Sequence, residues 1–183
     1  DETVLGFTVN PVIVITTSGF PDWTAGLAFS AQLVCNGGTG DINWSDKNSN
    51  LSGTGLTLSA TGLLSGTPVA TGTINFIAKA ADEIGASTEK GLSVYINPAI
   101  NITTVDLPDW TVNIAYAQTV TATGGTGGLT FSDKNGDLTP TGLVLNADGT
   151  VTGTPTQVGP VSFIVEVADG IGALSEKSLD FAI

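Results

Sequence analysis

The side chains that could do chemistry in this chain are carboxylates, because the other common catalytic groups are missing or nearly so. The sequence has no histidine and no arginine, and it has one cysteine, Cys35. Without an imidazole it lacks the usual general base near neutral pH and the histidine-activated serine and cysteine nucleophiles. Two carboxylates facing each other across a cleft remain as a catalytic arrangement. The acids at recurring positions, among them Asp46 and Asp82, fall in expected loops, so we predict that the protein is not an enzyme.

The charge of the chain restricts its binding partners. Seventeen acidic residues and five lysines give a formal net charge of -12. Nucleic acids are bound through clustered lysine and arginine residues that neutralise phosphates. A chain with this negative net charge lacks such a cluster. No apolar stretch approaches the 18 residues of a membrane-spanning helix. We therefore expect no nucleic-acid partner and no direct membrane insertion.

The chain consists largely of an 87-residue repeat. Residues 10–96 align with residues 97–183 without a gap, and 41 of the 87 positions are identical. Residues 1–9 lie outside the two copies, and Gly6–Val9 resembles Ser93–Ile96 at the end of the first copy. We predict repeat 1 at 10–96 and repeat 2 at 97–183, preceded at 1–9 by the last strand of an earlier repeat or by an N-terminal extension. The sequences common to both copies are NP, PDWT, GGTG, SDKN, GTP and AD followed by IGA.

Within each repeat, apolar residues alternate with polar ones, which is typical of strands half buried in a sheet. Phe29 and Leu33 belong to one such segment, whose repeat 2 counterpart is expected to start its inward alternation at Ile114, and Ile74, Phe76 and Ala78 belong to another. Glycine-rich turns separate about seven such strands per repeat, and no segment has the period of a helix. Seven short strands in 87 residues indicate a Greek-key sandwich of two sheets. The predicted fold is all-β, with two tandem seven-stranded sandwiches in which Cys35 is a small buried core residue.

The order of these short sequences resembles a known family. The series LPDW, AY, GGTG, GL, GTP and F-V-V-D, read over Leu107–Ile183 and again over Phe20–Ile96, is similar to the putative-Ig and dystroglycan-type cadherin-like repeats of large bacterial and archaeal surface or secreted proteins. The resemblance covers nearly the whole chain. It implies Ig-like/cadherin-like sandwiches at the cell surface or outside the cell. It implies no particular ligand, because one fold serves many functions.

The cadherin branch of this resemblance implies calcium as a cofactor between successive modules. Calcium takes six to eight oxygen ligands, which carboxylate and amide side chains supply. Several cadherin ligand positions are missing, since Gly66-Thr67-Pro68 stands where cadherins have an acidic sequence. The alternative is that the same residues cap turns through side-chain to backbone hydrogen bonds, without a metal. The oxygen ligands expected where repeat 1 meets repeat 2 are Asp22, Asp46, Asn48, Asn50, Asn97, Asp148 and Asp169.

The tryptophans offer a second kind of binding chemistry, because exposed aromatic rings can hold sugar rings. Trp44 alternates with Ile42 and is replaced by Phe131 in repeat 2, so we predict that it is a core residue. Trp23 and Trp110 follow Pro-Asp in both copies. They are expected to pack beneath that loop or against a neighbouring module, with sugar contact as the alternative.

These observations predict a non-enzymatic extracellular repeat that serves as a spacer, stalk or adhesion module of a larger surface or secreted protein. Its expected partners are neighbouring repeats of the same chain and a protein or glycan ligand at the surface. Pro98 in the short linker restricts the backbone and favours an extended, semi-rigid pair of modules. Two alternatives remain, namely a carbohydrate-binding or other ligand-binding accessory module of a secreted enzyme, and a calcium-rigidified cadherin-like adhesin.

Overall fold

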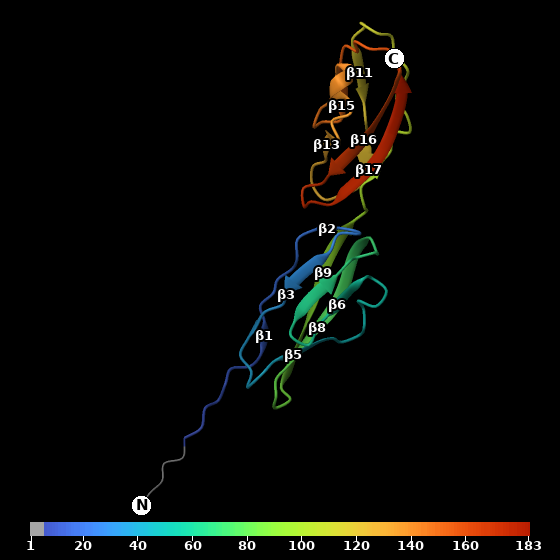
Figure 1. Cartoon of the computed structure of the whole chain (residues 1–183). Coiled ribbons are helices and arrows are strands. Elements are labelled where there is room, and N and C mark those ends of the chain that lie inside the picture. The colour runs from blue at the N-terminus through green and yellow to red at the C-terminus, as the bar shows by residue number, and fades with distance from the viewer. Residues whose placement is uncertain (1–5) are drawn as a thin grey trace, which may run out of the picture. The chain divides into compact units, whose positions relative to one another are not determined.

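The chain divides into two compact units, Asp1–Ile96 (unit 1) and Asn97–Ile183 (unit 2), shown in the computed structural model of Figure 1. The structure describes residues 6–183. Residues 1–5, which belong to the segment predicted to be a strand remnant or an extension, lie outside the described part.

Unit 1 is a sandwich of antiparallel sheets. One sheet has the strand order β2-β9-β8-β5, the facing sheet has the order β3-β7-β6, and β1 pairs with β4 at the side. The strands are β1 (Val14–Ile15), β2 (Trp23–Thr24), β3 (Phe29–Gln32), β4 (Cys35–Asn36), β5 (Asn43–Asp46), β6 (Leu56–Leu58), β7 (Leu63–Gly66), β8 (Gly72–Ala81) and β9 (Ser87–Asn97).

Unit 2 repeats this topology, with the sheets β13-β16-β17, β11-β15-β14 and β10-β12. The segment equivalent to β2 is not a regular strand, but it makes the corresponding contact with β17. There the Trp110 amide donates to the Ala182 carbonyl at 2.8 Å, and Asp109 Oδ1 accepts from the Ala182 amide at 2.7 Å. The elements are β10 (Asn101–Ile102), β11 (Tyr116–Thr119), β12 (Ala122–Thr123), β13 (Thr130–Asp133), the 3-10 turn η1 (Thr139–Thr141), β14 (Leu143–Leu145), β15 (Thr150–Gly153), β16 (Pro160–Ala168) and β17 (Leu174–Ala182).

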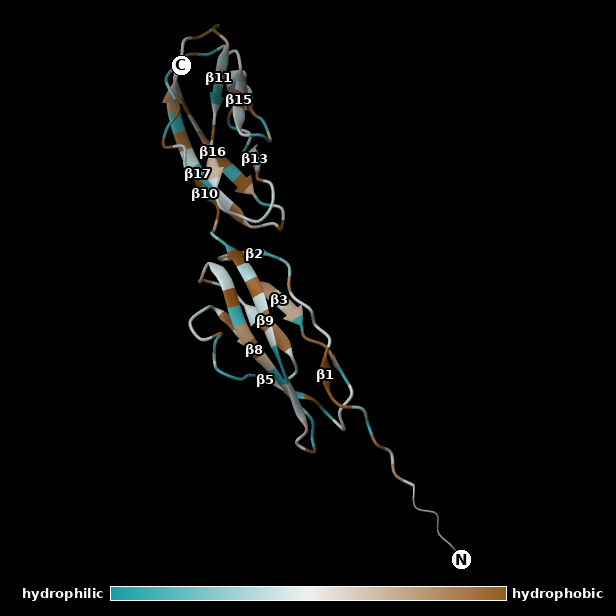
Figure 2. Ribbon diagram, turned by 180° about the vertical axis from the view of Figure 1, so that it is seen from behind, coloured by the Kyte–Doolittle hydropathy of each residue, from teal (hydrophilic) through white to brown (hydrophobic). Residues whose placement is uncertain are grey.

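The alternation in the sequence places one side of each long strand in a core. It is visible as bands of differing hydropathy along the long strands of each unit in Figure 2. In β8, Ile74, Phe76, Ala78 and Ala80 are buried while their neighbours are exposed or half-buried, and β16 has the same pattern. Trp44 is buried among the core residues of unit 1, which confirms the prediction for that residue. Each unit therefore has its own apolar interior.

The two interiors place different aromatic rings around the same position, which is Phe29 at the start of β3 in unit 1 and Tyr116 at the start of β11 in unit 2. In unit 1, Phe20 packs edge-on against Phe29, with ring centroids 5.9 Å apart. In unit 2, Phe181 stacks on Tyr116 at 5.3 Å. In each unit, an aliphatic residue stands where the other unit has its partner ring. The total side-chain volume around this position is therefore conserved, because one substitution compensates for the other. The replacing residues are Leu107 for Phe20 and Val94 for Phe181.

The all-β prediction is confirmed. The one helical element among residues 6–183 is the three-residue 3-10 turn η1, where Pro140 supplies a backbone angle suited to it; the equivalent position in unit 1 is Gly53. Two residues differ from their predictions. Cys35 is half-buried at the edge of the core rather than fully buried, and burial raises the pKa of its thiol. Ile114, predicted to follow the inward alternation, is 53% exposed because it precedes β11 in a loop. In the described part of the chain, no helix has the length and apolar character needed to cross a bilayer.

Candidate functional site

The aspartate of the shared AD sequence joins two loops in each unit. Asp82 is 8% exposed and Asp169 is 7% exposed. In unit 2, the Asp169 carboxylate accepts backbone hydrogen bonds from Thr126 at 2.8 Å, Ile171 at 3.0 Å and Ala173 at 2.8 Å. A buried carboxylate is stabilised by such donors. The residue that resembles a cadherin ligand therefore holds the β16–β17 turn against the GGTG loop.

An asparagine of the NP sequence meets the same loop. Asn97 Nδ2 donates to Thr126 Oγ1 at 3.0 Å, and Asn10 Nδ2 donates to Thr39 Oγ1 at 3.1 Å in unit 1. Two of the predicted calcium ligands, Asn97 and Asp169, are thus brought together around Thr126. Both already take part in hydrogen bonds within unit 2.

Asp46, which was predicted to lie in a loop, is the last residue of β5, and Asn48 and Asn50 lie in the loop that follows. Asp46 Oδ2 accepts from the Leu51 amide at 2.8 Å, and its counterpart Asp133 accepts from Leu138 at the same distance. This geometry is a turn capped by an aspartate. Asp46 Oδ1 is buried without a hydrogen-bond partner among the described residues. Asn48 and Asn50 are exposed.

The remaining candidates lie on the surface. Asp22 is exposed beside β2. Asp148 is exposed in the turn between β14 and β15, where hydrogen bonds from the Thr150 hydroxyl and amide lower its pKa. Within each unit, as far as residues 6–183 describe it, no three cysteine, aspartate or glutamate side chains form a group that could hold a metal ion. A calcium site formed by Asp22, Asp46, Asn48, Asn97, Asp148 and Asp169 stays a prediction.

The recurring tryptophans pack beneath their loops. Trp23 lies edge-on to Phe29 with ring centroids 5.4 Å apart, and Trp110 lies edge-on to Tyr116 at 5.5 Å. Each indole also donates a hydrogen bond to a carbonyl four residues later, at 3.1 Å and 3.2 Å respectively. These contacts confirm the predicted packing beneath the loop and use the polar atom of both rings.

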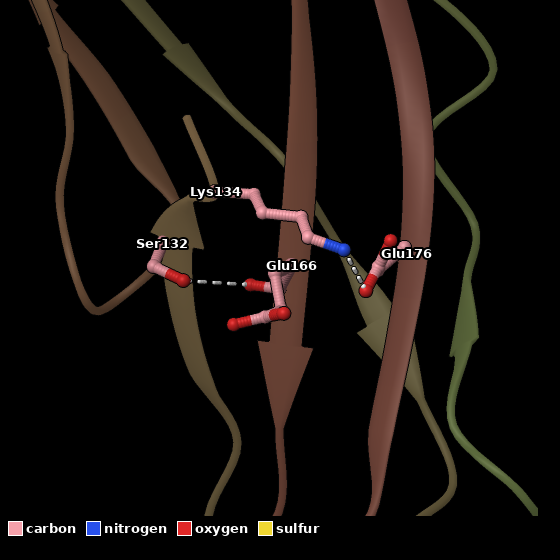
Figure 3. A network of polar contacts seen from close by, with 4 residues as sticks. All are labelled: Ser132, Lys134, Glu166 and Glu176. Carbon is pink, nitrogen blue, oxygen red and sulfur yellow. Dashed lines mark hydrogen bonds and ion pairs between the residues drawn. The ribbon is translucent and has the colours of Figure 1, made fainter. Parts of the chain in front are cut away.

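The lysines that occur in both repeats make matching contacts on the outer sheet face. Lys134 extends across β16, past Glu166, to an ion pair with Glu176 on β17, as Figure 3 shows. The hydrogen bond with Glu176 is the main cause that raises the pKa of Lys134. Unit 1 has the equivalent pair between Lys47 and Glu89. Exposed pairs of this kind contribute little stability, so they indicate a shared surface geometry rather than a strong clamp.

A groove on the same outer face of unit 1 was not predicted from the sequence, although two of the expected calcium ligands, Asn48 and Asn50, lie on its rim. It has a volume of about 420 Å³ and crosses β8 and β9 between the loop after β5 and the segment that precedes β2. Its outer rim carries asparagine and serine side chains, and its middle lies where Ile77 pairs with Gly91. Tyr95 stands farther along the same face of β9 and is 44% exposed. The rim residues are Ser18, Asn48, Asn50, Asn75 and Ser93.

Sequence reasoning missed this groove because it considered tryptophans as the aromatic candidates. A signal was present in the outward positions of the last strand. Gly91, Ser93 and Tyr95 occupy alternate positions, and their repeat 2 counterparts are Ser178, Asp180 and Ala182. Differences between the copies at outward positions are therefore the feature that marks the groove.

Comparison with solved structures gives the same architecture. An I-band fragment of titin, I67–I69, is 9% identical with a TM-score of 0.51, and an E-to-A variant of these titin domains is 10% identical with a TM-score of 0.53; the match covers 93% of this chain and 65% of each titin chain. Drosophila OTK extracellular domains 3–5 are 12% identical with a TM-score of 0.39, covering 90% of this chain and 58% of theirs. The chain thus spans about 58–65% of the length of these structures. At such low identity the titin matches establish the fold alone.

A search of curated proteins found no match. The family model described as Putative Ig domain matches twice, at residues 11–97 and at residues 98–183. The two matches are consecutive and together span nearly the whole chain. The chain belongs to the Putative Ig domain family, of which it contains two tandem copies.

Proposed function

We propose that this chain is a non-enzymatic tandem module of an extracellular or surface protein, in which it acts as a structural spacer or stalk. The module supplies folded length between other parts of the protein, and each copy is stabilised by its own core. Membership of the Putative Ig domain family supports this role. So does the lack of histidine, arginine and a paired cysteine, which leaves few groups for covalent or acid–base chemistry.

The observation that carries the proposal is that polar residues common to both copies make contacts within their own unit. Asp82, Trp23 and Lys90, like their counterparts, make contacts within their own unit. Lys90 Nζ donates to the Ile15 carbonyl, and Lys177 Nζ donates to the Thr104 carbonyl at 2.6 Å. Beyond their apolar cores, the two copies therefore share a set of hydrogen bonds within each unit. A function based on repetition requires the retention of the fold rather than of a reactive site.

Pulling single molecules from both ends tests this function. A spacer should hold its folded length and then unfold in two separate steps. A fully extended chain of 87 residues spans about 300 Å. Each step should therefore lengthen the molecule by this amount minus the folded length of one unit. The control is a glycine–serine chain of 183 residues, which extends smoothly. A smooth extension of this protein, without two steps, would contradict the proposed spacer function.

A further inference from the structure

We propose that the outer face of β8 and β9 in unit 1 is a binding site for a neutral carbohydrate. This inference goes beyond the spacer function and concerns one of the two copies. It rests on the groove that contains Asn75, Gly91 and Ser93, and on the neighbouring ring of Tyr95.

The hollow arises from a missing side chain. Gly91 points outward from β9 opposite Ile77 on β8, and a Cβ atom at Gly91 would meet no atom within 4 Å. The space above the sheet is therefore open at this point. In unit 2 the corresponding position is Ser178, whose side chain would occupy the space.

The rim offers unused hydrogen-bonding groups. Among the described residues, no hydrogen bond within the protein engages the side chains of Asn48, Asn50, Asn75 or Ser93. Asn75 and Ser93 are direct cross-strand partners, so their side chains stand about 5 Å apart at the Cβ atoms. Amide and hydroxyl groups both donate and accept hydrogen bonds. This set matches the hydroxyl groups of a sugar.

Tyr95 supplies a ring next to these polar groups. It lies two residues from Ser93 on the same face of β9, a distance of about 7 Å along the strand. An exposed aromatic ring offers an apolar surface with a polar edge, which suits one face of a sugar ring. Unit 2 has Ala182 at this position.

The charges around the groove select an uncharged ligand. No carboxylate is among the residues that line it, so it has no ligand set for a cation. The net charge of -12 opposes an anionic ligand such as an acidic polysaccharide. Lys47 and Glu89 form an ion pair next to the groove, and Lys79 on the same face of β8 is the cross-strand partner of Glu89. A neutral glycan is the class of ligand that satisfies these conditions.

The two copies share the strands beneath the groove but differ in many of the residues that line it. The ion pair at one end of the groove occurs in both units, as do the strands beneath it. Five of the groove residues and the neighbouring Tyr95 differ in unit 2, whereas Asn48 and Ile77 recur as Asn135 and Ile164. The counterparts of Ser18, Asn50, Asn75, Gly91, Ser93 and Tyr95 are Val105, Asp137, Ser162, Ser178, Asp180 and Ala182.

The first test is a nuclear magnetic resonance titration of the labelled full chain. The probes are hexasaccharides of β-1,4-glucose, β-1,3-glucose, xylose and mannose, with hexagalacturonate as the charged control. At least one neutral probe should bind saturably with a Kd of about 1 mM or below. The shifted amides should cluster at residues 75, 91, 93 and 95, and hexagalacturonate should leave them unchanged. The proposal is overturned if no neutral probe shifts these amides, or if the charged control binds there as well as the neutral probes.

The second test replaces groove residues by their unit 2 counterparts. Tyr95→Ala and Ser93→Asp should each raise the Kd of the bound hexasaccharide about tenfold, and Gly91→Ser should weaken binding by filling the hollow. The matched control is Asp180→Ser in unit 2, which should leave the Kd unchanged. All four positions are exposed, so thermal melts should show the fold intact. Unchanged binding in both Tyr95→Ala and Ser93→Asp would overturn the proposal.

Discussion

The backbone amide of Thr126 donates a hydrogen bond to the buried carboxylate of Asp169 at 2.8 Å, across 43 positions of the sequence. Thr39 and Asp82 make the same contact in unit 1 at 3.0 Å. In each case the bond joins the GGTG loop to the turn between the two longest strands. This aspartate is therefore part of the framework of the fold, and its replacement should act on stability.

Asp169→Ala should lower the free energy of unfolding of unit 2 by about 3 kcal/mol, because it leaves several backbone amides unsatisfied in a buried loop. Urea denaturation followed by hydrogen exchange would measure the loss and assign it to unit 2. The exposed Asp137→Ala is the control and should change the stability by less than about 0.5 kcal/mol. Equal stability of the two variants would show that the contact is unimportant.

At two positions of the repeat, the backbone is left-handed in both copies. One copy has glycine there, and the other copy has a residue with a side chain. Ser49 has φ 56° where unit 2 has Gly136 at 75°, and Asn113 has φ 63° where unit 1 has Gly26 at 84°. Ser49→Gly should stabilise unit 1 by about 0.5 kcal/mol by relieving steric strain. Gly26→Asn should be nearly neutral, since asparagine tolerates this conformation, whereas Gly26→Val should cost about 1–2 kcal/mol. Melting temperatures that fall for Ser49→Gly would contradict this explanation.

Tyr116 predicts an alkaline loss of stability in unit 2. Burial, assisted by the charge of Asp109, raises its pKa from 10 to about 12. The folded state therefore disfavours the phenolate. The contribution of neutral Tyr116 to the free energy of unfolding is complete below pH 10 and is lost as the pH rises toward 12. Urea denaturation at pH 8, 10 and 11.5 should show this loss in the wild type, and Tyr116→Phe should remove it. The same pH dependence in both proteins would rule out Tyr116 as the cause.

The alternating pattern was sufficient to predict the sandwich and its buried residues, because alternation directly sets which side of a strand is buried. Phe76 and Trp44 are examples. The groove could not be predicted in the same way, since it depends on the pairing of Ile77 with Gly91 and on a loop from another part of the chain. The exposure of Ile114 was also missed, because the alternation continues into a loop that precedes the strand.

Calcium provides a separate test of the predicted oxygen ligands. We expect the melting temperature to agree within about 1 °C in 5 mM calcium chloride and in chelator, because Asp169 and Asn97 are already engaged in hydrogen bonds within unit 2. A calcium-rigidified adhesin predicts instead a rise of several degrees with calcium. Abolition of such a rise by Asp46→Asn or Asp148→Asn would establish the calcium site and refute our expectation.

The independence of the two cores is the central claim, and hydrogen exchange of matched core variants tests it most directly. Phe76 and Phe163 occupy the same position in the two units and are 2% and 1% exposed. Phe76→Ala should cost about 3–5 kcal/mol and reduce amide protection in unit 1, while unit 2 keeps its protection. Phe163→Ala should produce the reverse. A loss of protection throughout residues 10–183 in either variant would show a single shared core and contradict the account.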